Sequence, residues 1–283
     1  MDRPIASHAF DDGRDRWSVA AAPPATPLAA WVDRYAWWSE RTESFTTRRE
    51  LAATTGVLIV NLGSALEIVD ASGTLHRLGP GQGFAGGIAR ATSLSRSTGA
   101  MAGVHVHMPP ATLARLLGVP LAALTDRCVT LADLLGGDAD RLGERLLAAD
   151  GHEARWRVLD AFLATRAEQA RDADREVEHA RARLADGLRV EAVALDLGWS
   201  RKRLAQRFRD ATGLHPRAYA CLARFERFAT RLRTRPAQPL AEAALDAGYA
   251  DQAHLSREVL RYADLTPAAL RAKLIPEGGG VMQ

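Results

Sequence analysis

The sequence predicts an α+β protein in which a β-rich first part precedes an all-helical last part. Short β-branched or apolar runs, separated by Gly, Pro and Asp-Ala-Ser-Gly turn signals, fill residues 31–108. Apolar residues at helical spacing follow from about residue 109 almost to the end of the chain. Within the last hundred residues one motif occurs twice, 50 positions apart. These observations predict a small antiparallel barrel or sandwich followed by a helical region with an internal repeat.

The totals set limits on the kind of protein. A chain of 283 residues suggests two domains, because single hydrophobic cores stop growing near this size. The longest apolar runs, such as GVLIVNLG at 56–63, are too short to span a bilayer, and the first residues show no signal-peptide core. Cys128 and Cys221 are far apart and form no metal-binding pair. We expect a cytoplasmic protein with no cofactor and no membrane partner.

Each segment has its own pattern. Residues 1–30 are rich in Ala and Pro and are expected to be irregular, whereas residues 31–130 are expected to form the β-rich domain. The run MAGVHVHM at 101–108 has the period-two alternation of a strand, and a proline pair then opens a helix. Residues 131–176 are predicted to be a helical linker with alternating charges, either solvated or a dimerisation surface. Residues 177–275 are strongly helical, and residues 276–283 form a tail.

Basic residues are concentrated in the last third of the chain. The formal net charge is only +3, yet residues 181–283 carry 18 basic and 11 acidic side chains. Such an asymmetry is a sign of a nucleic-acid partner. Net charge indicates the kind of partner and not the fold. The alternative is therefore a basic domain that is soluble and binds no nucleic acid.

The repeat decides between these two interpretations. Copy one is VALDLGWSRKRLAQRFRDATGLHPRAY at 193–219, and copy two is AALDAGYADQAHLSREVLRYADLTPAAL at 243–270. Copy two holds one extra residue after its aromatic position. The matched pairs are Ala194 with Ala244, Leu195 with Leu245, Asp196 with Asp246, Gly198 with Gly248, Trp199 with Tyr249, Leu204 with Leu255, Phe208 with Val259 and Pro216 with Pro267.

The residue types of each copy predict a helix-turn-helix. A glycine, Gly198 or Gly248, suits the positive φ that ends a first helix. Ser200 and Asp251 are good N-caps for the second helices, and Thr266 for the helix that follows copy two. The second helix buries an i,i+4 pair, which is Leu204 with Phe208 in copy one and Leu255 with Val259 in copy two.

The face opposite each buried pair carries residue types that recognise DNA. Arg and Gln side chains pair with guanine and adenine edges in the major groove. Two such motifs joined by one helical connector at 217–233 can place two recognition helices about one DNA turn apart. The predicted DNA-binding residues are Ser200, Arg201, Lys202, Arg203, Gln206, Arg209, Gln252, Ala253, His254, Ser256, Arg257 and Arg261.

With these motifs, residues 177–274 resemble the DNA-binding domain of the AraC/XylS family of bacterial transcription regulators. The resemblance is carried by GW-SRKRLAQRF with TGLHP in copy one and by AGYADQAHLSRE with LTPAALR in copy two. It implies a seven-helix domain with two recognition helices in successive major grooves, and base readers at Lys202, Gln206, Gln252 and Arg257. The N-terminal part of the chain resembles the degenerate cupin-like sensor domain that precedes the DNA-binding domain in many members of this family.

Copy two departs from the family pattern at two positions. The family usually has an aromatic residue where this chain has Val259, and often glycine where it has Asp264. We therefore expect copy two to pack less tightly. Because SRKR is unusually basic, we expect copy one to supply most of the affinity for phosphates.

The N-terminal part offers a few residues for ligand binding. His105 and His107 share one face of a strand, and His76 would complete a three-histidine metal set, but no glutamate follows at the spacing of a cupin enzyme. Ordinary strand histidines are the simpler interpretation, and we assign no metal site. Trp37 and Trp38 are adjacent on a strand, so only one of them points inward. The candidate ligand residues are Trp37, His105 and His107.

Three functions compete. The favoured one is a sequence-specific DNA-binding transcription regulator, not an enzyme and with no catalytic residues, whose N-terminal domain senses a small-molecule effector. Its partners would be double-stranded DNA, RNA polymerase in the case of an activator, and a second copy in the case of a homodimer. The alternatives are a metal-dependent cupin enzyme with an accessory DNA-binding domain, and a regulator whose N-terminal domain only dimerises.

Overall fold

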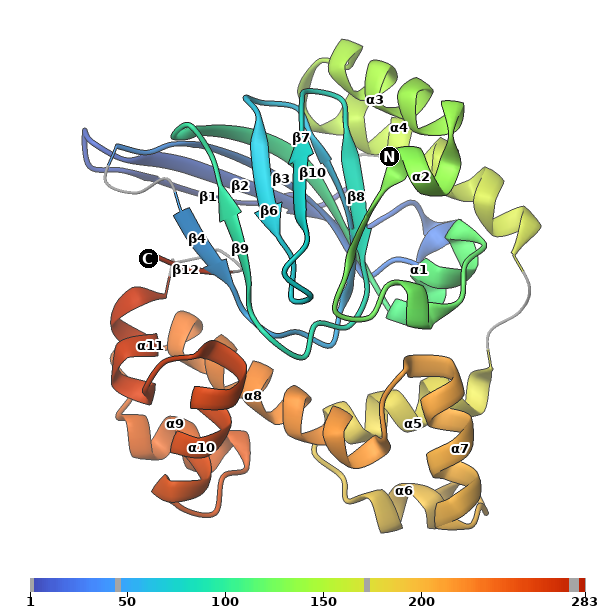
Figure 1. The fold of residues 1–283 in the computed structure, drawn as a ribbon, viewed down its shortest axis with the longest axis vertical. Coiled ribbons are helices and arrows are strands. Elements are labelled where there is room, and N and C mark those ends of the chain that lie inside the picture. The colour runs from blue at the N-terminus through green and yellow to red at the C-terminus, as the bar shows by residue number, and fades with distance from the viewer. Residues whose placement is uncertain (1–2, 44–46, 171–173, 275–279, 283) are drawn as a thin grey trace. The chain divides into compact units, whose positions relative to one another are not determined.

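A computed structural model describes residues 3–43, 47–170, 174–274 and 280–282 (Figure 1). The chain divides into two compact units. The first comprises Met1–Arg48, Thr55–Gly87 and Ser93–Arg171, and the second comprises Arg49–Thr54, Ile88–Thr92 and Asp172–Gln283. The first unit is rich in strands and the second is built of helices, so the predicted α+β class is confirmed.

The first unit contains two antiparallel sheets. The larger has the strand order β1-β2-β3-β10-β5-β8-β11, and in the other β4, β9, β6 and β7 are neighbours in that order. The bounds are β1 (Ala6–Asp11), β2 (Arg16–Ala22), β3 (Arg34–Arg41), β4 (Thr47–Glu50), β5 (Gly56–Asn61), β6 (Leu66–Val69), β7 (Leu75–Leu78), β8 (Gly83–Gly86), β9 (Ser93–Arg96), β10 (Ala100–Met108) and β11 (Cys128–Thr130).

The larger sheet buries apolar side chains on both faces. On one face a small cluster joins the two sheets, with Leu66, Ile68 and Leu78 against Phe84. The other face packs against helices in a larger core that includes Tyr35 and Trp156, both fully buried. The helices of this unit are α1 (Pro110–Leu117), α2 (Leu131–Leu135), α3 (Gly137–Ala148) and α4 (Gly151–Gln169), with 3-10 turns at Thr26–Leu28 and Leu121–Ala123.

Two expectations for this part of the chain differ from the structure. The first 30 residues were expected to be irregular, yet β1 and β2 form a hairpin that pairs with β3. Residues 131–176 were expected to link the domains, but α2, α3 and α4 bury leucines and Trp156 in the core of the first unit. The alternating surface charges of these helices concealed a buried stripe, which on α4 consists of Trp156, Leu159 and Leu163.

The described part of the second unit contains seven helices. They are α5 (Arg175–Ala185), α6 (Val190–Asp196), α7 (Arg201–Thr212), α8 (Pro216–Thr234), α9 (Leu240–Ala247), α10 (Gln252–Ala263) and α11 (Pro267–Lys273). The long helix α8 lies centrally, with α6 and α7 near one end and α9 and α10 near the other (Figure 1). Its fully buried residues Tyr219, Phe225 and Phe228 contribute to a core shared by both helix pairs.

Two short segments from the first half of the chain belong to this helical unit. Ala53 and Ala89 form a β-bridge, and Leu51, Ala52 and Ile88 are part of the helical core. Thr54 donates from its backbone N–H and from its hydroxyl to the carboxylate of Glu226 on α8. Burial raises the pKa of Glu226 above its ordinary value, although the hydrogen bonds from Thr54 oppose the rise.

Part of the predicted tail forms a short strand. Gly280–Met282 form β12, and Val281 is buried in a bridge with Leu274. Residues 276–279 and 283 of the tail lie outside the described residues. No helix in the described ranges is long and apolar enough to cross a membrane.

Candidate nucleic-acid interface

The two repeats fold as the predicted helix-turn-helix pairs. In copy one, α6 and α7 are joined at Gly198, whose φ is +63°, and the Ser200 hydroxyl accepts from the N–H of Arg203 at 3.2 Å. In copy two, α9 and α10 are joined at Gly248, whose φ is +94°, and the Asp251 carboxylate accepts from the N–H of His254 at 2.7 Å. Both glycines and both caps are as predicted from the sequence.

The predicted inner faces are also buried. Leu204 and Phe208 are fully buried in copy one, as is Val259 in copy two, and Leu255 is 4% exposed. The expected looser packing of copy two is thus not seen in the burial of these positions. Tyr262, three residues after Val259, is also buried and packs against Phe225 with ring centroids 5.4 Å apart.

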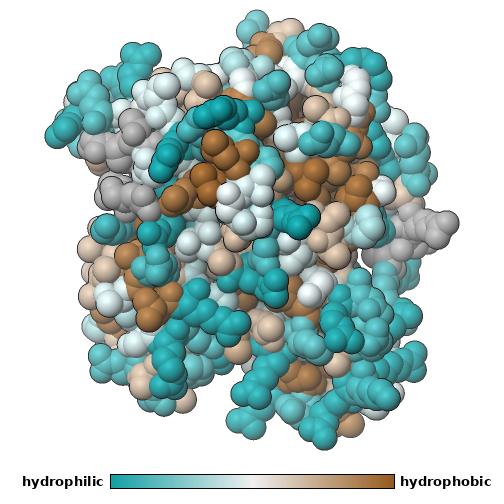
Figure 2. All heavy atoms as spheres, viewed as in Figure 1, coloured by the Kyte–Doolittle hydropathy of each residue, from teal (hydrophilic) through white to brown (hydrophobic). Residues whose placement is uncertain are grey.

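Most of the predicted DNA-binding residues lie on the solvent side of these helices. His254 and Ser256 are half-buried, and the other ten are exposed. In the view of Figure 2 the second unit shows mostly hydrophilic side chains. The exposed candidates are Ser200, Arg201, Lys202, Arg203, Gln206 and Arg209 in copy one, and Gln252, Ala253, Arg257 and Arg261 in copy two.

The outer face of α7 is basic, and part of it is held in place by contacts within copy one. The helix carries five basic side chains and one acidic one. The Gln206 amide nitrogen donates to Asp210 at 2.9 Å, and its oxygen accepts from Arg209 at 2.8 Å. The guanidinium of Arg203 lies 4.8 Å from the ring centroid of Trp199. These contacts orient the side chains of the outer face before any ligand binds.

The outer face of α10 is less charged than that of α7. An ion-pair network joins α10 to α8 on its inner side. Arg224 of α8 donates to both carboxylate oxygens of Glu258, at 2.7 and 3.1 Å. Burial opposes ionisation of Glu258, but the hydrogen bonds and charge of Arg224 outweigh it and lower the pKa of this carboxylate. His254 joins the network, 3.1 Å from Arg224, and packs edge-on against Tyr249.

His254 is half-buried, and its ring packs against Tyr249 and Arg224 inside the unit. Its contact with DNA stays a prediction. Arg257, by contrast, is exposed and makes no hydrogen bond or ion pair within the described chain. At this position copy two therefore presents the unpaired guanidinium of Arg257. At the equivalent position copy one presents the Gln206 amide, which is hydrogen-bonded within α7.

The candidate ligand residues of the first unit do not converge on one site. Trp37 packs against α4, with the guanidinium of Arg155 4.4 Å from its ring centroid. His105 and His107 face the space between the two sheets, because their neighbours in the register are Ile59 and Val57. Burial lowers the pKa of His105 to about 4, and it also lowers the pKa of His107, so both rings are neutral near pH 7.

The three-histidine metal set is not assembled. His76 lies on β7 with its Nε2 atom 3.3 Å from Asp70, while His105 and His107 lie on β10 of the other sheet. Among the residues that the structure describes, no group of three or more His, Cys, Asp or Glu side chains could hold a metal ion.

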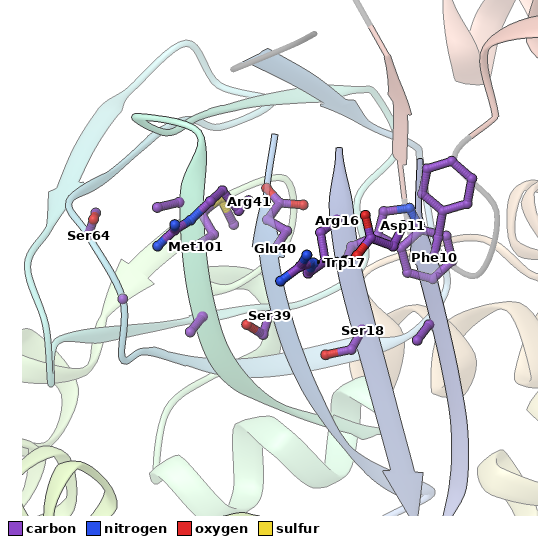
Figure 3. A pocket seen from close by; sticks show the side chains of 14 residues that line it. Phe10, Asp11, Arg16, Trp17, Ser18, Ser39, Glu40, Arg41, Ser64 and Met101 are labelled. Carbon is purple, nitrogen blue, oxygen red and sulfur yellow. Dashed lines mark hydrogen bonds and ion pairs between the residues drawn. The ribbon is translucent and has the colours of Figure 1, made fainter. Parts of the chain in front are cut away.

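A cleft of about 590 Å³ lies on the larger sheet of the first unit (Figure 3). Its floor is a row of small residues paired across four strands, which are Ala9, Ser18, Ser39 and Ala102. The next row on the same face carries Asp11, Arg16, Arg41 and Ala100. Because the side chains of the first row are small, the sheet surface is hollowed above them. The side chains of Arg16 and Arg41 lie at the edge of this hollow. Sequence reasoning missed this cleft because its residues come from strands far apart along the chain.

Comparison with known proteins supports the two-part organisation. Residues 196–273 match the family model of a helix-turn-helix domain, and residues 20–130 match that of a domain of unknown function, DUF6597. No curated protein matches the sequence.

Solved structures of low identity share the fold. Apo ToxT from Vibrio cholerae strain SCE256, a single-residue variant, has a TM-score of 0.52 and 12% identity over 84% of this chain and 97% of that chain. A second structure of ToxT from Vibrio cholerae gives a TM-score of 0.51 and 12% identity over 84% and 98%. The AraC-like transcriptional activator CuxR is 18% identical over 78% of this chain and 85% of its own, with a TM-score of 0.34, too low to compare the folds. At this identity the likeness to ToxT shows the fold alone.

A β-rich unit joined to tandem helix-turn-helix pairs defines the class of two-domain, DNA-binding transcription regulators. The helix-turn-helix match over residues 196–273 and the two repeats support a DNA-binding domain of the AraC type in the second unit.

Proposed function

We propose that this regulator places α7 and α10 in successive major grooves of one asymmetric DNA site. The observation that carries the proposal is the pair of exposed polar faces at equivalent positions of the two repeats, within one unit and at either end of α8. Helix α8 has 19 residues and so measures about 28 Å at 1.5 Å per residue. That length is close to the roughly 34 Å repeat of the major groove.

The side chains divide into two roles in this proposal. Lys202 and Gln206 in copy one, and Gln252 and Arg257 in copy two, would contact base edges. Arg203 and Arg209 flank the first pair and would contact phosphates, which fixes the position of the domain without reading sequence. Gln206 would exchange its hydrogen bonds to Asp210 and Arg209 for base contacts.

The test is to find the DNA site by genome-wide binding and then to titrate a labelled duplex of that site. We expect Arg257→Ala and Gln206→Ala each to weaken specific binding by about 1–3 kcal/mol, or roughly 5- to 150-fold. Arg145→Ala removes the same charge from an exposed position of α3 in the first unit and should leave the affinity unchanged. If both recognition variants bind as tightly as the wild type, the assigned faces are wrong.

We further propose that a small-molecule effector binds the first unit in the cleft of Figure 3. The cleft has the volume typical of a small-molecule site. Arg41 is exposed at its edge and has no hydrogen-bond or ion-pair partner in the described chain, and the Ser18 and Ser39 side chains share its floor. Guanidinium and hydroxyl groups together suit a ligand with an anionic group such as a carboxylate.

Thermal melting in the presence of a metabolite panel tests effector binding, because a ligand that binds only the folded state raises the melting temperature. For an effector in the cleft, Ser39→Trp should abolish the shift by filling the floor, whereas Ser39→Ala keeps the space and should retain it. A shift that survives Ser39→Trp excludes the cleft and would favour the interior face with His105 and His107. No shift with any ligand would favour a first unit that only dimerises.

Reporter transcription from the identified site, with and without the effector, distinguishes an activator from a repressor. In the case of activation, RNA polymerase is the further partner.

A further inference from the structure

Strand β1 is unusual within the first unit because it is exposed along its whole length. All six residues, Ala6–Asp11, are exposed, whereas in its neighbour β2 every residue after Arg16 is buried or half-buried. Phe10 is 42% exposed, and Ile5 just before the strand is 47% exposed. The strand is held by its pairing with β2 and by the stack of Phe10 on Trp17, with ring centroids 5.7 Å apart. A strand that buries so little contributes little to the stability of its own chain.

One edge of β1 faces away from the sheet, since β1 is the last strand in the order. The N–H of Asp12 donates to the carbonyl of Asp15 at 3.2 Å, which makes residues 12 and 15 a hydrogen-bonded pair at the end of the hairpin. Pairs alternate along an antiparallel ladder, so the backbone groups of Ser7, Ala9 and Asp11 point outward. No hydrogen bond to these groups exists within the described chain.

This edge also lacks the usual protection against pairing. Natural edge strands carry Lys, Pro, a bulge or an inward charge that prevents association with another strand. From Ile5 to Phe10 the sequence is IASHAF, with no proline and no lysine, arginine or acidic residue, and the first charge is Asp11 at the end of the strand. The edge is therefore open to another strand.

We propose that two copies of this chain pair through their β1 edges, antiparallel and about a two-fold axis at Ala9. In this register Ala9 faces its own counterpart, and the side chain of Ser7 lies opposite that of Asp11, which can accept its hydroxyl hydrogen bond. His8 lies opposite Phe10 in the closer, non-hydrogen-bonded pair. Each copy thus presents complementary groups to the other, and no two carboxylates face each other.

Alternative registers are less favourable on the same grounds. An axis at Phe10 would place Asp11 opposite Ala9 and Asp12 opposite His8, and would leave Ser7 without a strand partner. An axis at His8 would place Ile5 opposite Asp11, which sets an apolar side chain against a carboxylate.

Sedimentation of the full-length chain over a range of concentrations tests the association. The wild type should form dimers, and Ala9→Pro should shift the equilibrium to monomer, because proline removes the outward N–H and is tolerated at a sheet edge. Ala9→Val is the matched control, since it retains the N–H, and it should dimerise as the wild type does. Circular dichroism and melting of each variant establish that the fold is retained.

Cysteine cross-linking tests the register without relying on a proline. Facing residues of a hydrogen-bonded pair have Cα atoms about 5.5 Å apart, within the range of a disulfide. Ala9→Cys should therefore form a covalent dimer on mild oxidation. Ser7→Cys should not, because its counterpart lies four residues along the strand, roughly 13 Å away. Oxidised wild type, with only Cys128 and Cys221, supplies the background.

The outcomes separate clearly. A dimer weakened at least tenfold by Ala9→Pro and cross-linked by Ala9→Cys but not by Ser7→Cys supports the proposal. A wild type that remains monomeric, a dimer unaffected by Ala9→Pro, or cross-linking at Ser7→Cys in preference to Ala9→Cys would each overturn it. A dimer that survives Ala9→Pro would place the contact elsewhere, for example on the helices of the first unit.

Discussion

The two helix-turn-helix copies share one backbone plan but present different chemistry to solvent. Helix α7 carries five basic side chains, and its Gln206 is already hydrogen-bonded within the helix. Helix α10 carries two arginines, of which Arg257 is unpaired, and rests on the Arg224–Glu258 network. The buried half of each copy is set by packing and is alike in both. The exposed half is free to diverge, so the copies can divide affinity and sequence recognition between them.

The largest effect on stability is expected from the buried side chains, which are alike in the two copies. Phe208→Ala should lower the free energy of unfolding by about 3–5 kcal/mol, since the ring is fully buried and its removal leaves a cavity. Leu195→Ala is the matched control in the same copy, because Leu195 is 82% exposed, and its effect should lie within about 0.5 kcal/mol. Denaturant titration followed by circular dichroism measures both. Equal losses would contradict the assignment of inner and outer faces.

The next effect concerns the exposed half and the salt dependence of DNA binding. Replacing Arg203 and Arg209 together with Ala should reduce the slope of log K against log salt by about 2, because each phosphate contact contributes about 0.9. The loss should be equal on specific and unrelated DNA. Replacing Arg257 should instead reduce the preference for the specific site, by about 1–3 kcal/mol. If the two variants behave alike, the proposed division between phosphate-contacting and base-contacting side chains fails.

A smaller effect is expected where each recognition helix ends. Gly213 closes α7 with a φ of +75°, while Asp264 closes α10 with a φ of +56°. Gly213→Ala should cost about 1–2 kcal/mol, because a side chain is disfavoured in the left-handed region. Asp264→Gly relieves that strain but removes an ion pair with Arg49, so its net effect should stay within about 0.5 kcal/mol. Thermal unfolding compares the two; a large loss from Asp264→Gly would show that the ion pair dominates.

The smallest effect is a pH dependence that both copies share through α8. Because the folded chain raises the pKa of Glu226, it binds this proton more tightly than the unfolded chain does. The free energy of unfolding should therefore fall as the pH rises from about 4.3 through the raised pKa. Glu226→Gln keeps groups that can bond to Thr54 and should flatten this part of the profile, measured by melting across pH. A wild-type stability that rises throughout that range would contradict the raised pKa.

Local features of the second unit could be predicted from the sequence because they depend on near neighbours. The caps at Ser200 and Asp251, the glycine turns and the buried i,i+4 pairs all act within one or two helical turns. Features formed by distant segments could not. The hairpin of β1 and β2 is stabilised by pairing with β3, which outweighs its Ala- and Pro-rich composition.

The same limit applies to the candidate sites. The exposed faces of α7 and α10 follow from helical geometry, but the cleft of the first unit requires the register of four strands. Likewise, nothing in the local pattern around Thr54 indicates that it bonds to Glu226, which lies 172 residues away. The contact of His254 with Arg224 could not be predicted either, because Arg224 lies on another helix.

Helix α8 has buried residues along its whole length, and it carries a helix pair at each end. A helix turns by about 100° and rises 1.5 Å for every residue added. One inserted residue in α8 would thus rotate copy two relative to copy one by more than a quarter turn while barely changing their separation. In the proposed complex, the length of α8 therefore sets the angle between the two recognition helices as well as their separation. The DNA site would have to match both the distance between two grooves and the side of the duplex from which they are entered.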